Sequence, residues 1–356
     1  MTNPVSSTSS ADATVRRGLW PRRTASRHWE DRLWLGASRV AVLIPLLGRA
    51  FVVVVLFVKA WPAVQVNGVG YLSRSTWQIG NLYGGIQHIH GVEIPQGANY
   101  GAWPLIAGTL QSSVIALIVA LPLSIGTAFA LTERMPKWIA QPLGFFVEIL
   151  AAIPSVVIGL WGGLVLGPFL SAHVYPLVAN HVPNVPVLNY FRGYVGQGEG
   201  LLTSGLILGF MIVPIIAATT RDLFNQVPSL PKEGAEALGF TEAEVARRIT
   251  IPWVRSGIIG ATILGFGRAL GETMAVAMVS GSIQGHLANN IYGTMTTIAA
   301  TIVTQLDSSF TDATGFALSN LAEIGLILAL ISILVNFGAR TIVSRSSKYR
   351  APLGRA

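Results

Sequence analysis

The chain of 356 residues has no cysteine and few charged residues. Without cysteine it forms no disulfide, thiolate metal site or thiol nucleophile. Only 11% of its residues are Asp, Glu, Lys or Arg, whereas about a quarter are charged in a typical soluble domain. No lysine follows a glycine, so the Gly-x-x-x-x-Gly-Lys-[Ser/Thr] loop that cradles nucleotide phosphates is missing. These absences predict a chain that is not an enzyme and that holds no metal and no cofactor of its own.

Long hydrophobic runs take the place of the missing charges. Hydrophobic residues make up 51% of the chain, and a membrane-spanning helix needs about 20 mostly apolar residues. We therefore predict an all-α polytopic membrane protein with about six transmembrane helices. The expected spans are residues 40–61, 106–131, 143–170, 201–220, 257–280 and 316–339.

The prolines inside these expected spans include Pro122, Pro154 and Pro214. Each removes a backbone hydrogen bond and is expected to kink its helix. Pro154, together with Ser155 and Gly159, is the expected hinge, and static helix curvature is the alternative.

Most of the 24 lysines and arginines lie at the chain ends and in the polar breaks near 132–142 and 221–256. Lysine and arginine accumulate in this way in cytoplasmic loops, so both termini are predicted to be cytoplasmic. The net charge of +8 then reports membrane topology, and no nucleic-acid partner is expected. Residues 1–35 are predicted to form a basic disordered tail that contacts membrane lipids at most weakly. A transmembrane permease domain of residues 36–345 and a basic tail of residues 346–356 follow.

The polar segment at about 223–256 carries residues at a specific spacing. Glu233, Ala235 and Gly239 are followed after nine residues by Ile249, and then by Pro252. This spacing matches the EAA pattern of ABC importer permeases, from which the chain departs at Gly234 and Ile251. We expect these residues to couple the chain to a cytoplasmic ATPase, and an ordinary amphipathic loop is the alternative.

The same pattern predicts local structure. Two short helices, about 231–238 and 241–249, are expected to be separated at Gly239, because glycine readily takes a positive φ. Thr241 is placed to cap the second helix, with Glu244 three residues later as its capping-box partner. The small side chains at Ala235 and Gly239 are expected to allow a close fit to a partner's groove.

Three longer stretches resemble the permeases of phosphate-uptake ABC importers. They are LAAIPSVVIGLWG (150–162), MIVPIIAATTRDLF (211–224) and GFGRALGETMAVAMVSG (265–281), and the GRALGETMAV string is similar to the PstC-type subunit. The resemblance covers roughly residues 40–345. It implies a type I ABC importer permease fold in the cell membrane of a prokaryote.

What the resemblance implies about function is the import of inorganic phosphate, driven by ATP hydrolysed elsewhere. The implied partners are a PstA-like permease, two PstB-like ATPase subunits that carry the ATP and Mg²⁺, and a PstS-like phosphate-binding protein. An ABC permease for another oxyanion, such as sulfate, molybdate or phosphonate, is one alternative. A secondary anion transporter or channel, for which the coupling segment is superfluous, is another.

Two charged residues stand in the fifth expected span. Arg268 and Glu272 are four residues apart and are expected to share one helix face, beside a ridge formed by Gly267 and Gly271 that permits close helix packing. Ionisable groups inside a membrane are costly and are usually functional. A guanidinium offers forked donors that suit a tetrahedral oxyanion. We predict that Arg268 and Glu272 line the substrate pathway, and a buried salt bridge that fixes helix packing is the alternative.

Two further carboxylates, Glu148 and Glu323, also fall inside expected spans. They are predicted to belong either to polar packing networks or to the substrate pathway. Arg49 is a possible partner for either one.

Overall fold

The computed structural model describes residues 27–186 and 188–347 of the chain. The chain divides into two compact units, Met1–Val52 and Val53–Ala356. Most of the predicted tails therefore lies outside the described residues. The first helix nevertheless begins at Arg27, inside the range predicted to be disordered. The sequence RHWEDRLWL at this point contains no glycine or proline and is rich in residues that tolerate or favour a helix.

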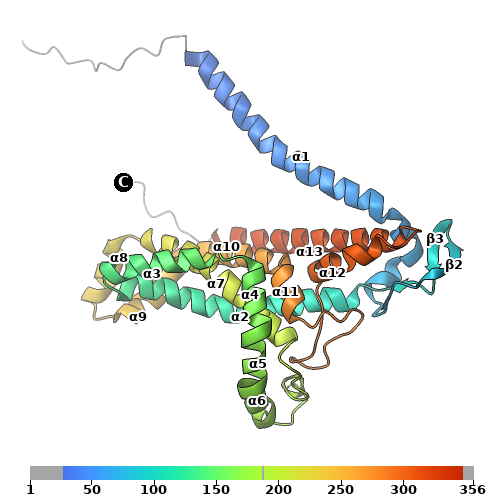
Figure 1. Cartoon of the computed structure of the whole chain (residues 1–356). Helices are drawn as coiled ribbons and strands as arrows, with labels where there is room; N and C mark the ends of the chain where they lie inside the picture. The colour runs from blue at the N-terminus through green and yellow to red at the C-terminus, as the bar shows by residue number, and fades with distance from the viewer. Residues whose placement is uncertain (1–26, 187, 348–356) are drawn as a thin grey trace, which may run out of the picture. The chain divides into compact units, whose positions relative to one another are not determined.

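Helices dominate the structure, and Figure 1 shows their order along the chain. The longer helices are α1 (Arg27–Asn67), α2 (Trp103–Phe129), α3 (Lys137–Leu150), α7 (Leu201–Asn225), α10 (Ile251–Leu270), α12 (Ile298–Ser309) and α13 (Phe316–Ser347). The shorter ones are α4 (Ser155–Trp161), α5 (Gly167–Phe169), α6 (Tyr175–His181), α8 (Ser229–Ala237), α9 (Glu242–Val245) and α11 (Met274–Val279). Wide π-helical turns are η2 (Ala130–Arg134), η3 (Gly162–Leu166), η4 (Leu170–Val174) and η6 (Ala246–Thr250), and tight 3₁₀ turns are η1 (Val69–Leu72) and η5 (Asn189–Phe191).

Six helical segments among the described residues are long and apolar enough to cross a membrane, which confirms the predicted number. They are Leu33–Asn67, Trp103–Arg134, Ser155–His181, Leu201–Asn225, Glu242–Leu270 and Phe316–Thr341. The chain is therefore a multi-pass membrane protein.

The third predicted span, 143–170, is wrong in its bounds. The chain leaves helix α3 at Leu150 and resumes at Ser155. Pro154 explains the break, because proline lacks the N–H and disfavours helical geometry in the residue before it. Pro122 and Pro214, in contrast, lie inside the continuous helices α2 and α7.

The predicted loop at 62–105 contains strands that the sequence reading missed. Strand β1 (Trp77–Gln78) pairs antiparallel with β4 (Asn99–Tyr100), and β2 (Asn81–Ile89) pairs antiparallel with β3 (Val92–Gln96). The second pair turns at His90 and Gly91, which both have positive φ, as a two-residue hairpin turn requires.

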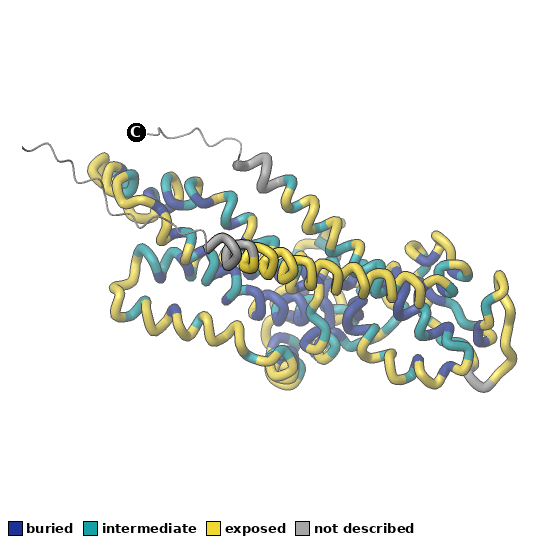
Figure 2. Tube along the Cα trace, turned by 90° about the horizontal axis from the view of Figure 1, so that it is seen from above, coloured by how far each residue is buried: buried dark blue, intermediate teal, exposed yellow. Residues whose placement is uncertain are grey.

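The core of the second unit forms where α2 packs along α7. Small side chains meet there: a Cβ added at Gly209 would lie 3.3 Å from the carbonyl oxygen of Ala116, and one at Gly205 would lie 2.5 Å from a methyl carbon of Ile115. Such small residues let membrane helices approach closely. Figure 2 shows buried residues gathered where the helices of this unit cross and exposed residues on their outer faces.

Candidate functional site

The segment at about 223–256 is called the coupling segment here, after its predicted role, and its two short helices, the first of them α8, are called the coupling helices. Helix α8 ends in a glycine turn. Gly239 has φ of 86°, its N–H donates to the Glu236 carbonyl (2.8 Å), and the Phe240 N–H donates to the Ala235 carbonyl (3.2 Å). This pair of bonds is the Schellman arrangement that ends a helix at a left-handed residue. The predicted break at Gly239 and its physical reason are confirmed.

The second coupling helix starts with the predicted cap. The Glu244 N–H donates to the Thr241 hydroxyl (3.4 Å), and the Thr241 N–H donates to the Glu244 carboxylate (3.0 Å). Helix α9 then continues without a break through η6, which contains Ile249, into α10, which carries Pro252 in its first turn. Pro252 has no N–H to donate to the backbone ladder, and it lies just after the wide turn η6, where that ladder is already irregular. The second coupling helix and the fifth span are thus one rod, Glu242–Leu270.

One side of α8 packs against the rest of the chain, and the other side is exposed. Ala235 is 5% exposed, so its small size serves packing inside the chain, and the expected role in fitting a partner's groove is wrong for this residue. Glu233 and Gly239 are exposed, and nothing lies within 4 Å of a Cβ built at Gly239. Leu230 and Leu238 present apolar side chains that are 78% and 79% exposed. Both side chains are open to contact by another chain.

The fifth span ends earlier than predicted. Helix α10 stops at Leu270, Gly271 caps it, and Glu272 lies in the turn before α11. The expected shared helix face of Arg268 and Glu272 is therefore wrong, and no ion pair joins these two side chains in the part of the chain that the structure describes. Glycine favours this interruption, because it is a poor helix former.

Arg268 is exposed and lies at an open hollow of about 530 Å³ between α7, α10 and α13. Its lining is apolar apart from Arg268 and Asn336; the other residues are Ile215, Ile263, Leu264 and Gly267. Nothing lies within 4 Å of a Cβ built at Gly267, so the predicted glycine ridge is not covered by this chain. The guanidinium thus has room for a ligand or for a neighbouring subunit.

The other two carboxylates lie in different surroundings. Glu148 on α3 accepts a hydrogen bond from Arg221 on α7, with 2.5 Å between nitrogen and oxygen. Glu323 on α13 is 6% exposed and accepts from the side-chain amide of Asn67 at 2.8 Å. The structure therefore gives each carboxylate a partner other than Arg49, and it does not bring them together with Arg268.

The buried end of α13 is joined to the outer strands by more polar groups. The Asn67 amide also donates to Asn320 (2.7 Å), and Arg74 donates to the Asn67 carbonyl and to the Asn99 side chain (3.2 Å). Burial raises the pKa of the nearby Tyr71 phenol well above its ordinary value. This network gives Glu323 a hydrogen-bond donor within the chain, and its place in the substrate pathway stays a prediction.

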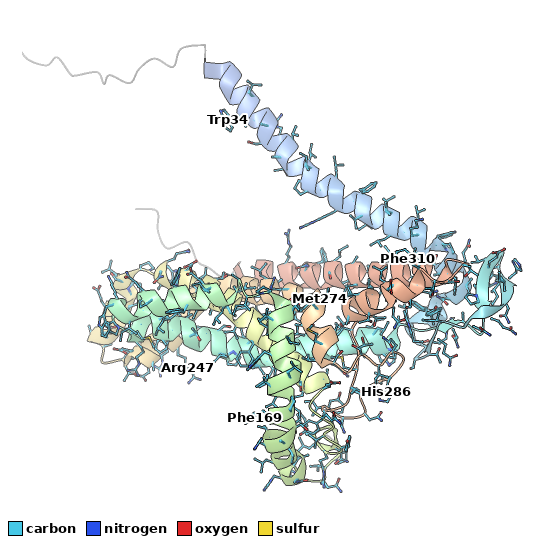
Figure 3. All side chains as sticks on the ribbon, in the orientation of Figure 1. Trp34, Phe169, Arg247, Met274, His286 and Phe310 are labelled. Atoms are coloured by element: carbon cyan, nitrogen blue, oxygen red, sulfur yellow. The ribbon has the colours of Figure 1, made fainter. Side chains whose placement is uncertain are left out.

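The two interrupted spans pack on each other. Helix α4, which starts after Pro154, lies against α11, which starts at Met274 (Figure 3). A Cβ at Gly159 would come within 2.7 Å of the Ala275 Cα, and one at Gly162 within 3.1 Å of a Val279 methyl carbon. Because both contacts advance in the same chain direction, the two short helices run parallel from their breaks. The predicted hinge at Pro154 is a break in the chain's helix, and its motion stays a prediction.

The sequence reading missed two ion pairs beside the coupling helices. Lys232 on α8 contacts Glu133 at 2.5 Å, and Glu242 on α9 contacts Arg134 at 3.4 Å. The only signal was indirect: the breaks at 132–142 and 221–256 are predicted to lie on the same membrane side, and each contains charges of both signs.

Comparison with known proteins places this geometry in a family. Residues 120–348 match the model of the binding-protein-dependent transport system inner membrane component. The phosphate transport system permease protein PstC 1 of Mycobacterium tuberculosis is 55% identical over 322 residues, which cover 90% of this chain and 95% of that protein. The chain belongs to the PstC group of these permeases. The PstC permease of Mesorhizobium japonicum is 38% identical over 338 residues, covering 95% of this chain and 94% of its own length.

A solved structure agrees with the fold of this PstC-type permease. The bacterial alginate ABC transporter, in complex with an alginate-bound periplasmic protein, contains a chain that superimposes with a TM-score of 0.55 at 15% identity. The match covers 92% of this permease and 98% of that chain. The predicted type I ABC importer permease fold is confirmed.

Proposed function

We propose that this chain is the PstC-type permease subunit of an ATP-driven importer that moves inorganic phosphate into the cytoplasm. The observation that carries the proposal is the 55% identity to a phosphate transport permease over 90% of the chain. The coupling segment favours an ATP-driven importer over a secondary transporter or channel, since a self-sufficient carrier has no use for it.

The coupling segment is the proposed dock for a PstB-like ATPase. Leu230 and Leu238 offer exposed apolar contacts, and Glu233 and Gly239 lie beside them on the exposed surface of α8 and its turn. Two ATPase copies are then required, one for this permease and one for a PstA-like permease. ATP and Mg²⁺ belong to those subunits, and this chain binds no cofactor.

The opposite end of the molecule offers a surface for a PstS-like binding protein. The loops before α7 and α12 enclose an open hollow of about 410 Å³, called the outer hollow below, which is lined by residues that include Tyr194, Glu199, His286, Asn290 and Thr294. His286 marks this region in Figure 3. Its hydroxyl, amide and carboxylate groups suit hydrogen bonding to a folded partner.

We assign the substrate pathway to the surface around Arg268. The exposed guanidinium supplies a permanent positive charge and forked donors, and the uncovered glycines Gly267 and Gly271 leave room for the second permease. Glu272, in the turn after α10, lies outside the helix of Arg268, so it is proposed to border the pathway without neutralising the arginine.

The test is phosphate uptake by the reconstituted complex in proteoliposomes with ATP inside. Arg268→Gln should assemble at wild-type levels and lose most uptake, Arg268→Lys should keep part of it, and Arg340→Gln, the same change at another exposed arginine, should keep all of it. Because Arg268 and Glu272 form no ion pair, adding Glu272→Gln to Arg268→Gln should not restore uptake. A double variant that transports normally would remove Arg268 from the pathway.

The same assay separates the alternatives. Uptake without ATPase subunits would favour a secondary transporter or channel. Competition by sulfate, molybdate or a phosphonate at concentrations equal to phosphate would favour another oxyanion.

Orientation is tested with single cysteines, because the chain has none of its own. A cysteine at the exposed Glu93 of the outer hairpin should react with an impermeant thiol reagent in intact cells. One at the exposed Glu236 of α8 should react only after permeabilisation. The reverse pattern would place both termini outside.

A further inference from the structure

The cytoplasmic end of the second span contacts both coupling helices through two consecutive residues. Glu133 and Arg134 are the last residues of η2, the wide turn that continues α2. The Lys232 ammonium on α8 donates to Glu133 at 2.5 Å, and the Arg134 guanidinium lies 3.4 Å from the Glu242 carboxylate on α9. We call these two ion pairs the clasp.

Helical geometry explains how neighbours in the sequence reach two different helices. Consecutive side chains on a helix point about 100° apart, so Glu133 and Arg134 diverge toward α8 and α9. The two pairs differ in strength. The side chains of Lys232 and Glu133 are 18% and 20% exposed, whereas those of Arg134 and Glu242 are 63% and 56% exposed. Solvent weakens exposed ion pairs, so the Glu133–Lys232 pair is the main contact.

From the clasp, α2 runs without interruption through the core. Its Ser124 hydroxyl donates to the Val213 carbonyl of α7 at 3.1 Å, in the same close helix contact that Ala116 makes with Gly209. A rigid helix packed in this way cannot slide past its neighbour without breaking these contacts.

The other end of α2 contacts the first residue of α12 and the segment just before it. The Ile298 N–H donates to the Thr109 hydroxyl at 3.0 Å, and a Cβ at Gly108 would lie 2.2 Å from the Thr296 carbonyl oxygen. Thr296 lies two residues after Thr294, which lines the outer hollow. Helix α2 with η2, Trp103–Arg134, therefore contacts the coupling helices at one end and the border of the outer hollow at the other.

We propose that the clasp makes α2 a transmission helix, which carries movement of the coupling helices to the outer mouth of the permease. The inference rests on the proposed function, in which an ATPase moves α8 and α9. Movement can already pass directly from α9 into α10, because the two are continuous. The clasp adds a second route, through α2. Glu133 and Lys232 act as positioning residues: they touch neither ATP nor phosphate, and they fix α2 to the moving helices.

The first test reverses the charges of the main pair in the reconstituted complex. Glu133→Lys and Lys232→Glu should each lower the phosphate moved per ATP hydrolysed by about fivefold or more, the range of an ordinary coupling energy. The reversed double variant should recover most of the wild-type ratio. Lys137→Glu, a charge reversal at the same rim but outside the clasp, should leave the ratio unchanged, and Arg134→Glu should have a smaller effect than Glu133→Lys. If either reversal disturbs assembly, Glu133→Gln replaces it.

The second test does not depend on phosphate. A single cysteine at Thr294 reports the outer mouth, and its labelling rate by an impermeant thiol reagent is measured with and without ATP and vanadate. In the wild-type complex ATP with vanadate should change the rate, whereas Glu133→Gln should abolish that change although the ATPase still binds and hydrolyses ATP.

The outcomes separate the two proposals. A wild-type complex that shows the nucleotide-dependent labelling but takes up no phosphate would contradict the proposed function and leave the clasp intact. Single variants with wild-type transport ratio and wild-type labelling would overturn the clasp, as would a reversed pair that restores neither.

Discussion

Replacing Gly239 tests the coupling turn because the structure isolates one physical effect. Gly239 has φ of 86°, and no atom lies within 4 Å of a Cβ placed there. A new side chain therefore meets no steric obstacle inside this chain. Its cost is the left-handed backbone alone, about 1–2 kcal/mol for a residue with a Cβ. Asparagine tolerates this conformation better and should cost less.

Gly234 supplies a control with the opposite sign. It lies in α8, also has open space around a Cβ, and lacks a positive φ. Gly234→Ala should therefore stabilise α8 by up to about 1 kcal/mol, since alanine is the better helix former. The same chemical change thus weakens the segment at Gly239 and strengthens it five residues earlier.

The assay is hydrogen–deuterium exchange of the peptide that contains the amides of residues 239 and 240, in the complex held in nanodiscs. These two N–H groups close the end of α8. If the helix end loses about 1–2 kcal/mol of stability in Gly239→Ala, these two amides should exchange roughly 5- to 30-fold faster than in the wild type. The increase should be smaller in Gly239→Asn. Exchange in Gly239→Ala that is as slow as in the wild type would refute the reasoning. An uptake loss larger than this strain explains would indicate that the ATPase packs directly on the turn.

Two further substitutions test the packing described above. Asn67→Ala leaves the buried Glu323 without its amide donor and should lower the free energy of unfolding by about 1–3 kcal/mol. The loss is measured as a lower thermal midpoint in detergent, and a midpoint equal to that of the wild type would show that Glu323 needs no partner. Gly159→Val adds a side chain whose Cβ would lie 2.7 Å from the Cα of Ala275, and it should lower the free energy of unfolding by about 1–3 kcal/mol through overpacking. Unchanged stability together with unchanged uptake would contradict the tight contact of α4 with α11.

The fold was readable from the sequence where hydrophobic length decides the structure. Six apolar runs gave six spans, because a lipid environment requires long helices. The interruptions were harder to place. Pro154 was singled out and does break its span, whereas Gly271 was assigned to a packing ridge and in fact ends α10. A glycine in an apolar run is compatible with both roles, and only the surrounding packing decides between them.

The candidate site shows the same difference between features set by the local sequence and features set by packing. The turn at Gly239 and the cap at Thr241 depend on neighbours in sequence, and both were predicted correctly. The predicted shared face of Arg268 and Glu272 required an unbroken helix, and this prediction is wrong because the helix ends before Gly271. Ion pairs such as Glu133 with Lys232 join segments far apart in the chain, so their partners follow from tertiary packing that no local pattern contains.

The continuous rod Glu242–Leu270 has a consequence for chain length. Each residue added to or removed from a helix rotates everything beyond it by about 100°. One inserted residue between Thr241 and Arg268 would turn the guanidinium away from its hollow while the coupling end stayed in place, unless a second wide turn like η6 absorbed it. Length variation should therefore be rare within this rod and common in the loops that flank it, so insertions in related chains should avoid this stretch.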